Sequence, residues 1–139
     1  NPMVFRTPTE NVKKVADSFD QIKNSTGYDL NLCLNTYKDG KGDDKTVCAS
    51  LYSPKSGILL EVFTNEPGIQ VYTGNFQGTG IACKHGIKYP KHVSVCFESQ
   101  KYPDSPTKIA QGVKGWTDAT LKPGEKYYSH LAYKFSVKK

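Results

Sequence analysis

The sequence predicts an all-β protein, an antiparallel β-sandwich with one short helix near its N-terminus. Nine Tyr and six Phe residues, together with Val, Ile and Thr, favour strands over helices. Short apolar runs follow one another along the chain and are separated by turns rich in Gly, Pro and Asp. One stretch alone has clear helical spacing. Many strands with short connections and no repeating helix are typical of an antiparallel sandwich.

The helix is predicted over residues 9–22, where Val12, Val15, Phe19 and Ile22 recur at helical spacing and Thr9 could cap the start. After a turn at 24–27 the pattern changes to β. Strands are expected at 30–34, 46–52, 58–64, 69–73, 92–97 and 126–137. The connections are expected to be a polar loop at 39–44, a turn at 53–57, a tight turn at 66–68, an irregular region at 74–86, a long loop at 103–115 and a turn at 122–125.

The closing strand shows the clearest alternation of apolar and polar residues. One face is predicted to carry Tyr127, Leu131, Tyr133, Phe135 and Val137. The other face is predicted to carry Tyr128, His130, Lys134 and Ser136. This period of two favours a strand of an antiparallel sheet over a helix.

The length of 139 residues fits a single domain over residues 1–139. The formal net charge is +6, but the Lys residues are scattered and Arg6 is the only Arg. Because proteins that bind nucleic acid more often gather positive charge on one stripe, we interpret the charge as a solvated surface and expect no nucleic-acid partner. No apolar run approaches the length of a membrane span, so no membrane partner is expected.

Four cysteines, Cys33, Cys48, Cys83 and Cys96, have spacings that match no zinc motif, so no metal site is predicted. Three of them lie in strand-like apolar runs, where a free Cys behaves as a small buried hydrophobic residue. We therefore expect reduced thiols and a cytoplasmic location. A secreted location stays open, because Asn24 begins a glycosylation sequon.

Glu98 follows directly on the apolar run from Val93 to Phe97. Because a buried charge without partners costs free energy, this carboxylate could be a general base whose pKa is raised by partial burial. It could instead accept hydrogen bonds from a polyol. Alternation along the strand could equally turn the side chain to solvent, so this segment by itself leaves the role of Glu98 open.

A string of polar and aromatic residues runs from Glu66 to Phe76. Gln70 and Asn75 each offer a donor and an acceptor, which suits sugar hydroxyls. Tyr72 and Phe76 could stack on the face of a pyranose. An ordinary strand followed by a turn would contain the same residue types.

Asp29 opens a strand directly after a turn, where it could bind a ligand or accept a hydrogen bond within the turn. The three histidines, His85, His92 and His130, are not at ligand spacing for a metal. His92 precedes Glu98 by six residues, so the two side chains would share a face of a regular strand. The alternative for His92 is a surface or supporting role.

Six stretches of the chain form an ordered set of motifs: GYDLN at 27–31, SGILLEVFT at 56–64, EPGIQVYTGNF at 66–76, YPKH at 89–92, VCFESQKYPD at 95–104 and LKPGEKY at 121–127. In order and spacing they resemble the aldose 1-epimerase (galactose mutarotase) family. The resemblance runs nearly from end to end of the chain.

The resemblance implies a β-sandwich of the large supersandwich type, of which this chain would be about the C-terminal half. It also implies interconversion of the α and β anomers of aldohexoses such as galactose and glucose, with no cofactor and no metal. Glu98 matches the base that takes the proton of the anomeric hydroxyl, and Asp29 and Gln70 match residues that hold the sugar. Asn75 and His92 are assigned to the same sugar-binding site.

The chain departs from the family pattern in several places. The general-acid His, a second site His and a sugar-binding Arg come from the N-terminal half of the family, and no His or Arg of this chain matches them. Leu30 stands where the family usually has His, and Ser99 stands where it usually has Thr. Residues 105–116 form a longer segment than the usual turn.

Three explanations stay open. The chain could be one piece of a two-chain enzyme, or it could be a half-length, non-catalytic sugar-binding module. It could also be a mutarotase-like fold reused for a protein partner. Because half a sandwich would expose unpaired edge strands and part of its core, we favour an N-terminal half chain or a homo-oligomer as the partner.

Overall fold

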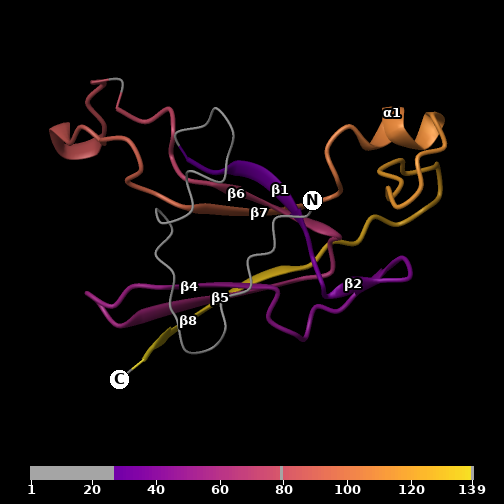
Figure 1. Cartoon of the computed structure of the whole chain (residues 1–139), viewed down its shortest axis with the longest axis horizontal. Coiled ribbons are helices and arrows are strands. Elements are labelled where there is room, and N and C mark those ends of the chain that lie inside the picture. The colour runs from indigo at the N-terminus through magenta and orange to yellow at the C-terminus, as the bar shows by residue number, and fades with distance from the viewer. Residues whose placement is uncertain (1–26, 79, 139) are drawn as a thin grey trace. The chain divides into compact units, whose positions relative to one another are not determined.

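The computed structural model describes residues 27–78 and 80–138, and it is built mainly of strands (Figure 1). The strands are β1 (Asp29–Cys33), β2 (Tyr37–Lys38), β3 (Lys41–Gly42), β4 (Ala49–Tyr52), β5 (Ile58–Thr64), β6 (Gly68–Tyr72), β7 (Cys96–Gln100) and β8 (Leu131–Val137). A 3₁₀ turn, η2 (Lys84–Gly86), and a short helix, α1 (Ser105–Ala110), complete the elements. The predicted all-β class is confirmed. The helix predicted over residues 9–22 lies outside the described residues.

The described chain divides into two compact units. One contains residues 27–32 and 70–98, and the other contains residues 33–69 and 99–138. The divisions fall within β1, β6 and β7, which form a three-stranded sheet in the order β1-β6-β7. The expectation of a single domain over residues 1–139 stays a prediction.

β6 is the central strand of that sheet. At one end Thr73 N donates to Tyr28 O at 3.1 Å, and at the other end Leu34 N donates to Pro67 O at 2.9 Å. β1 and β6 therefore run antiparallel, with bounds that match the predicted strands at 30–34 and 69–73 to within one residue. Ile69 of β6 is 1% exposed, so this strand carries core packing as well as polar side chains.

The second three-stranded sheet has the order β4-β5-β8. The predicted turn at 53–57 joins β4 and β5, and Ser53 N donates to Ile58 O at 2.9 Å where the hairpin closes. In both antiparallel pairs Val62 is matched, with Ala49 on one side and Tyr133 on the other. The side chain of Val62 is completely buried. The hairpin that the sequence predicts is therefore confirmed.

β8 confirms the predicted alternation, and the apolar face of the strand is exposed. Phe135 and Val137 share a face and are 68% and 70% exposed. On the opposite face Lys134 forms an ion pair with Glu61 of β5, with 3.0 Å between Nζ and Oε2. The strand also begins at Leu131 rather than at residue 126, so Tyr127 lies outside it.

The strand predicted at 92–97 is shifted toward the C-terminus, because β7 runs from Cys96 to Gln100. His92 has a φ of +59°, in the left-handed region, which is incompatible with a regular strand at that residue. The expectation that His92 and Glu98 share a strand face was therefore wrong. Residues 93–95 have no regular secondary structure and lead into β7.

The polar loop predicted at 39–44 overlaps a small hairpin, whose turn and second strand β3 fall within it and whose first strand β2 precedes it. Its two turn residues, Asp39 and Gly40, both have positive φ, at 51° and 79°. This is the geometry that favours Asp-Gly between two strands, because its twist matches that of the strands. The Asp39-Gly40 pair could therefore have predicted this hairpin from the sequence.

The long loop predicted at 103–115 is also wrong in part, because it contains α1 with Pro106 at its start. Trp116 closes this segment by donating Nε1–H to Pro103 O at 3.0 Å. Its ring meets that of Tyr102 edge-on, with 5.8 Å between the centroids. Burial raises the pKa of Tyr102 to about 12, and a hydrogen bond with the Cys33 thiol acts in the same direction.

Cys33 is exposed in β1, so the expectation of a small buried hydrophobic residue was wrong at this position. Cys48 and Cys96 are half-buried, and all four cysteines are free thiols. Within residues 27–78 and 80–138, no helix is both long enough and apolar enough to span a lipid bilayer.

We expect Ile69→Ala to lower the free energy of unfolding by about 2–5 kcal/mol, because it leaves a cavity in a closed part of the core. Ile81→Ala removes the same atoms from a side chain that is 70% exposed and should change that free energy by less than about 0.5 kcal/mol. Urea unfolding followed by circular dichroism measures both. Equal losses in the two variants would contradict the burial described for Ile69.

Candidate functional site

The sheet places three candidate residues on three neighbouring strands. Asp29 is the first residue of β1, Gln70 is the middle residue of β6 and Glu98 is the middle residue of β7. Neighbouring strands of a sheet lie about 4.8 Å apart. Gln70 Nε2 donates to Asp29 Oδ1 at 2.7 Å. The fold therefore joins Asp29 and Gln70 directly and carries Glu98 on the strand at the other side of Gln70.

Glu98 is exposed, although Phe97 and Ser99 beside it are half-buried. Of the alternatives that the sequence left open, the outward-facing side chain is the one found. A solvent-facing carboxylate is accessible to a ligand and can accept a proton or hydrogen bonds from it. The assignment of Glu98 as a catalytic base stays a prediction.

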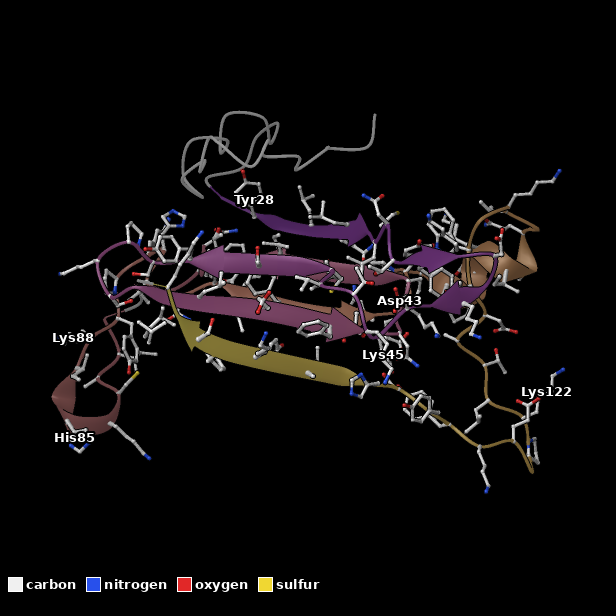
Figure 2. The ribbon with its side chains drawn as sticks, turned by 90° about the horizontal axis from the view of Figure 1, so that it is seen from below. Tyr28, Asp43, Lys45, His85, Lys88 and Lys122 are labelled. Atoms are coloured by element: carbon white, nitrogen blue, oxygen red, sulfur yellow. The ribbon has the colours of Figure 1, made fainter. Side chains whose placement is uncertain are left out.

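A buried cluster of hydrogen bonds holds the backbone just before Asp29. Thr73 Oγ1 accepts from Tyr28 N at 2.8 Å and donates to Asn75 Oδ1 at 2.7 Å. Asn75 Nδ2 donates to Tyr28 O at 2.8 Å, and Thr73 N donates to the same oxygen at 3.1 Å. Tyr28, Thr73 and Asn75 are each at most 5% exposed. We call this arrangement the Thr73 clamp, and Figure 2 shows Tyr28 where the chain enters β1.

Two glycines allow the Thr73 clamp to form. Gly74 has a φ of +63°, which lets the flanking Thr73 and Asn75 both turn toward Tyr28. At Gly27 a Cβ atom would collide with Asn75 Oδ1 and would lie 2.6 Å from Thr73 Oγ1 and 2.9 Å from His92 Cε1. No side chain therefore fits at Gly27 unless the clamp moves.

His92 reaches the Thr73 clamp from the loop before β7. Its Nδ1 lies 3.1 Å from Thr73 O, and because a carbonyl only accepts, this ring nitrogen carries the proton. Its backbone N–H donates to Gly74 O at 3.2 Å. The structure thus places His92 and Asn75 together at the Thr73 clamp, next to the backbone that leads into Asp29. That both residues contact a sugar stays a prediction.

Thr73 and Tyr28 were not singled out as site residues from the sequence. The available signal was the Thr73-Gly74-Asn75 triplet at a strand end, since Thr and Asn beside Gly often bond to nearby backbone groups. The triplet does not reveal that its partner is a residue 45 positions away.

An open pocket of about 380 Å³ lies next to the end of β6, lined by Tyr72, Phe76, Gln77, Gly78, Ile81, Cys83 and Tyr89. The rings of Tyr72 and Phe76 are stacked, with 6.5 Å between centroids, and Tyr72 Oη accepts from Phe76 N at 3.1 Å. Tyr72 follows Gln70 by two residues on the same strand, so both side chains lie on one face of the sheet. The polar pair and the aromatic pocket are therefore on the same face.

The loop between β6 and β7 carries His85 and Lys88, which project from its tip in Figure 2. Within the described residues no group of three or more His, Cys, Asp or Glu side chains could hold a metal ion. The candidate site consists of the carboxylates of Asp29 and Glu98, the amide of Gln70 and the rings of Tyr72 and Phe76.

The family model for aldose 1-epimerase matches residues 4–134 of this chain. The chain belongs to the aldose 1-epimerase family. Galactose mutarotase of Mus musculus is 40% identical over 111 residues, which are 80% of this chain and 30% of that protein. Galactose mutarotase of Homo sapiens gives the same figures. Aldose 1-epimerase of Escherichia coli strain K12 is 34% identical over 128 residues, which are 88% of this chain and 34% of that protein.

A solved structure shows the same aldose epimerase fold. The crystal structure of the GalM/aldose epimerase homologue from C. elegans superimposes with a TM-score of 0.70 and 25% identity, covering 91% of this chain and 35% of that chain. The mutarotase-like β-sandwich fold predicted from the sequence is confirmed. The chain spans about a third of the length of the aldose epimerase relatives it matches.

We expect Thr73→Val to lower the free energy of unfolding by about 1–3 kcal/mol. Valine keeps the shape of Thr73 but leaves Tyr28 N–H and Asn75 Oδ1 without the hydroxyl that both contact inside the clamp. Chemical denaturation at neutral pH measures the loss.

Thr36→Val is the matched control. Thr36 Oγ1 is buried and has no hydrogen-bond partner in the part of the chain that the structure describes, so its removal breaks no bond. This variant should be as stable as the original chain or slightly more stable. A loss in Thr36→Val equal to that in Thr73→Val would contradict the clamp.

Proposed function

We propose that this chain supplies the base and the sugar-holding residues of an aldose 1-epimerase site, which interconverts the α and β anomers of aldohexoses such as galactose and glucose. The observation that carries the proposal is the placement of Asp29, Gln70 and Glu98 on neighbouring strands β1, β6 and β7. Membership of the aldose 1-epimerase family supports that chemistry for the arrangement.

The sugar would be held by Asp29 and Gln70. Their mutual hydrogen bond uses one carboxylate oxygen and one amide hydrogen, so the pair keeps further acceptors and a donor for sugar hydroxyls. The stacked rings of Tyr72 and Phe76 lie farther along the same face and offer an apolar surface for the C–H groups of a pyranose. Phe76 is 77% exposed, so its ring is accessible to a ligand.

The proposed reaction uses one proton acceptor and one proton donor. Glu98 takes the proton of the anomeric hydroxyl while the bond between C1 and the ring oxygen breaks, and the ring oxygen takes a proton from a general acid. The product is the open-chain aldehyde. Rotation about the C1–C2 bond followed by the reverse transfers closes the ring as the other anomer and returns both protons.

We assign the general acid to an N-terminal half of the fold, present in a second polypeptide. His92 Nδ1 is bonded to Thr73 O, and His130 Nδ1 lies 3.3 Å from Asp44 Oδ2. Neither matches the acid motif of the family. The share of the relatives' length that this chain spans supports the assignment. A cytoplasmic location belongs to the same proposal and is supported by the free thiols.

Glu98→Gln should slow anomer interconversion by about 10²–10⁴-fold, because the amide cannot accept the proton. Polarimetry on freshly dissolved α-galactose measures the rate, in a preparation shown by mass spectrometry to contain both halves of the fold. Glu125→Gln is the control: Glu125 is exposed, and its carboxylate accepts a hydrogen bond from Lys122 N in a nearby turn. An unchanged rate in Glu98→Gln would show that Glu98 is not the catalytic base. A rate no faster than that in buffer for the unsubstituted preparation would contradict the proposed enzyme activity.

A non-catalytic sugar-binding or protein-binding module is the second candidate. It is favoured because no His of this chain matches the general-acid His of the family. It is also favoured by the segment at 105–116, where α1 and Trp116 replace the usual family turn. Isothermal titration with galactose and polarimetry, each run on the chain alone and with an N-terminal half added, separate the two classes. Saturable binding that stays without turnover when that half is present would support the sugar-binding module. Absence of both binding and turnover, also with an N-terminal half added, would point to a protein partner.

A further inference from the structure

We propose that Thr73 is a positioning residue for the sugar-holding pair. Through the backbone of Tyr28, it sets the location of Asp29 relative to Gln70. The inference rests on the proposed function for the ligand that the pair would hold. The geometric part of it, the control of the bond between Asp29 and Gln70, stands on the structure alone.

Besides the pairing of β1 with β6, two routes join Asp29 and Gln70. The direct route is the 2.7 Å hydrogen bond between Gln70 Nε2 and Asp29 Oδ1. The second route leads from Gln70 along three residues to Thr73, across the clamp to Tyr28, and then to the adjacent Asp29. The two routes close a small ring of covalent and hydrogen bonds, so a shift at Thr73 is passed through the backbone of Tyr28 to Asp29.

The two routes differ in their exposure to water. Asp29 is exposed, so solvent competes for its bond to Gln70. Thr73 is 2% exposed and Tyr28 is 2% exposed, so solvent does not compete for the clamp. The buried route can therefore hold the exposed pair in place before a ligand arrives, and pre-organisation of this kind strengthens binding.

The hydroxyl of Thr73 is the critical group in the clamp. It is the acceptor for Tyr28 N and the donor to Asn75 Oδ1, which orients the amide so that Asn75 Nδ2 faces Tyr28 O. Valine at this position loses both bonds, whereas serine keeps the hydroxyl. Asn75→Ala is milder, because Thr73 Oγ1 lies 3.4 Å from Tyr28 O and can turn toward that oxygen.

The experiment follows the side-chain amide of Gln70 by ¹⁵N NMR in the full chain, with the signal assigned by its loss in Gln70→Leu. In Thr73→Val the Gln70 amide signal should move toward the position of a solvated glutamine. In Thr73→Ser it should stay within the range of the original chain. Under the same conditions the galactose affinity of Thr73→Val should fall by about 10- to 100-fold, and Thr73→Ser should restore it.

Val62→Ala separates positioning from a general loss of stability. Val62 is completely buried in β5, so its truncation destabilises the fold without touching the clamp. All spectra are recorded where each variant is folded, and the Gln70 signal should not move in Val62→Ala. If Thr73→Val does not fold, Asn75→Ala gives the same comparison with a smaller expected shift.

An unmoved Gln70 signal in folded Thr73→Val or Asn75→Ala overturns the proposal, as does an equal shift in Val62→Ala. If the original chain binds no galactose, also with an N-terminal half added, the proposed function fails. The Gln70 signal then still decides whether Thr73 controls the pair.

Discussion

The hydrogen bonds of the Thr73 hydroxyl are the constraint on which the candidate site depends. They join the start of β1 to the end of β6, across 45 residues of chain, in a place that water does not reach. A buried donor or acceptor that loses its partner carries the full cost of desolvation. The backbone at Tyr28 therefore has one favourable arrangement. Because Asp29 follows Tyr28 directly, this arrangement also fixes the backbone position of Asp29.

Elements with strong local patterns could be predicted from the sequence. The hairpin of β4 and β5 follows from two apolar strands around a turn, and its register is fixed because Val62 must be buried. The Asp29–Gln70 pair was predicted as a set of site residues from motifs, and the structure joins their side chains at 2.7 Å. Neither the pairing of β1 with β6 nor that bond is visible in either segment alone.

The remaining features depend on contacts that sequence patterns do not carry. The apolar run before Glu98 looks like a strand from its first residue, but the backbone of His92 has positive φ and pairing begins only at Cys96. Helix α1 has six residues, too few for a helical period to be recognised. Thr73 was missed because its partner Tyr28 is distant in the sequence, so its role follows from tertiary structure alone.

The exposed face of β8 has a consequence for the behaviour of the protein in concentrated solution. The strand reads Leu-Ala-Tyr-Lys-Phe-Ser-Val, with Lys134 as its single charge, and within residues 27–78 and 80–138 its one partner strand is β5. An apolar strand with an unpaired edge is a template for cross-molecule β pairing and fibril growth. Charged residues that interrupt an apolar strand oppose such pairing, and Lys134, beside Glu61, is the charge of this kind in β8.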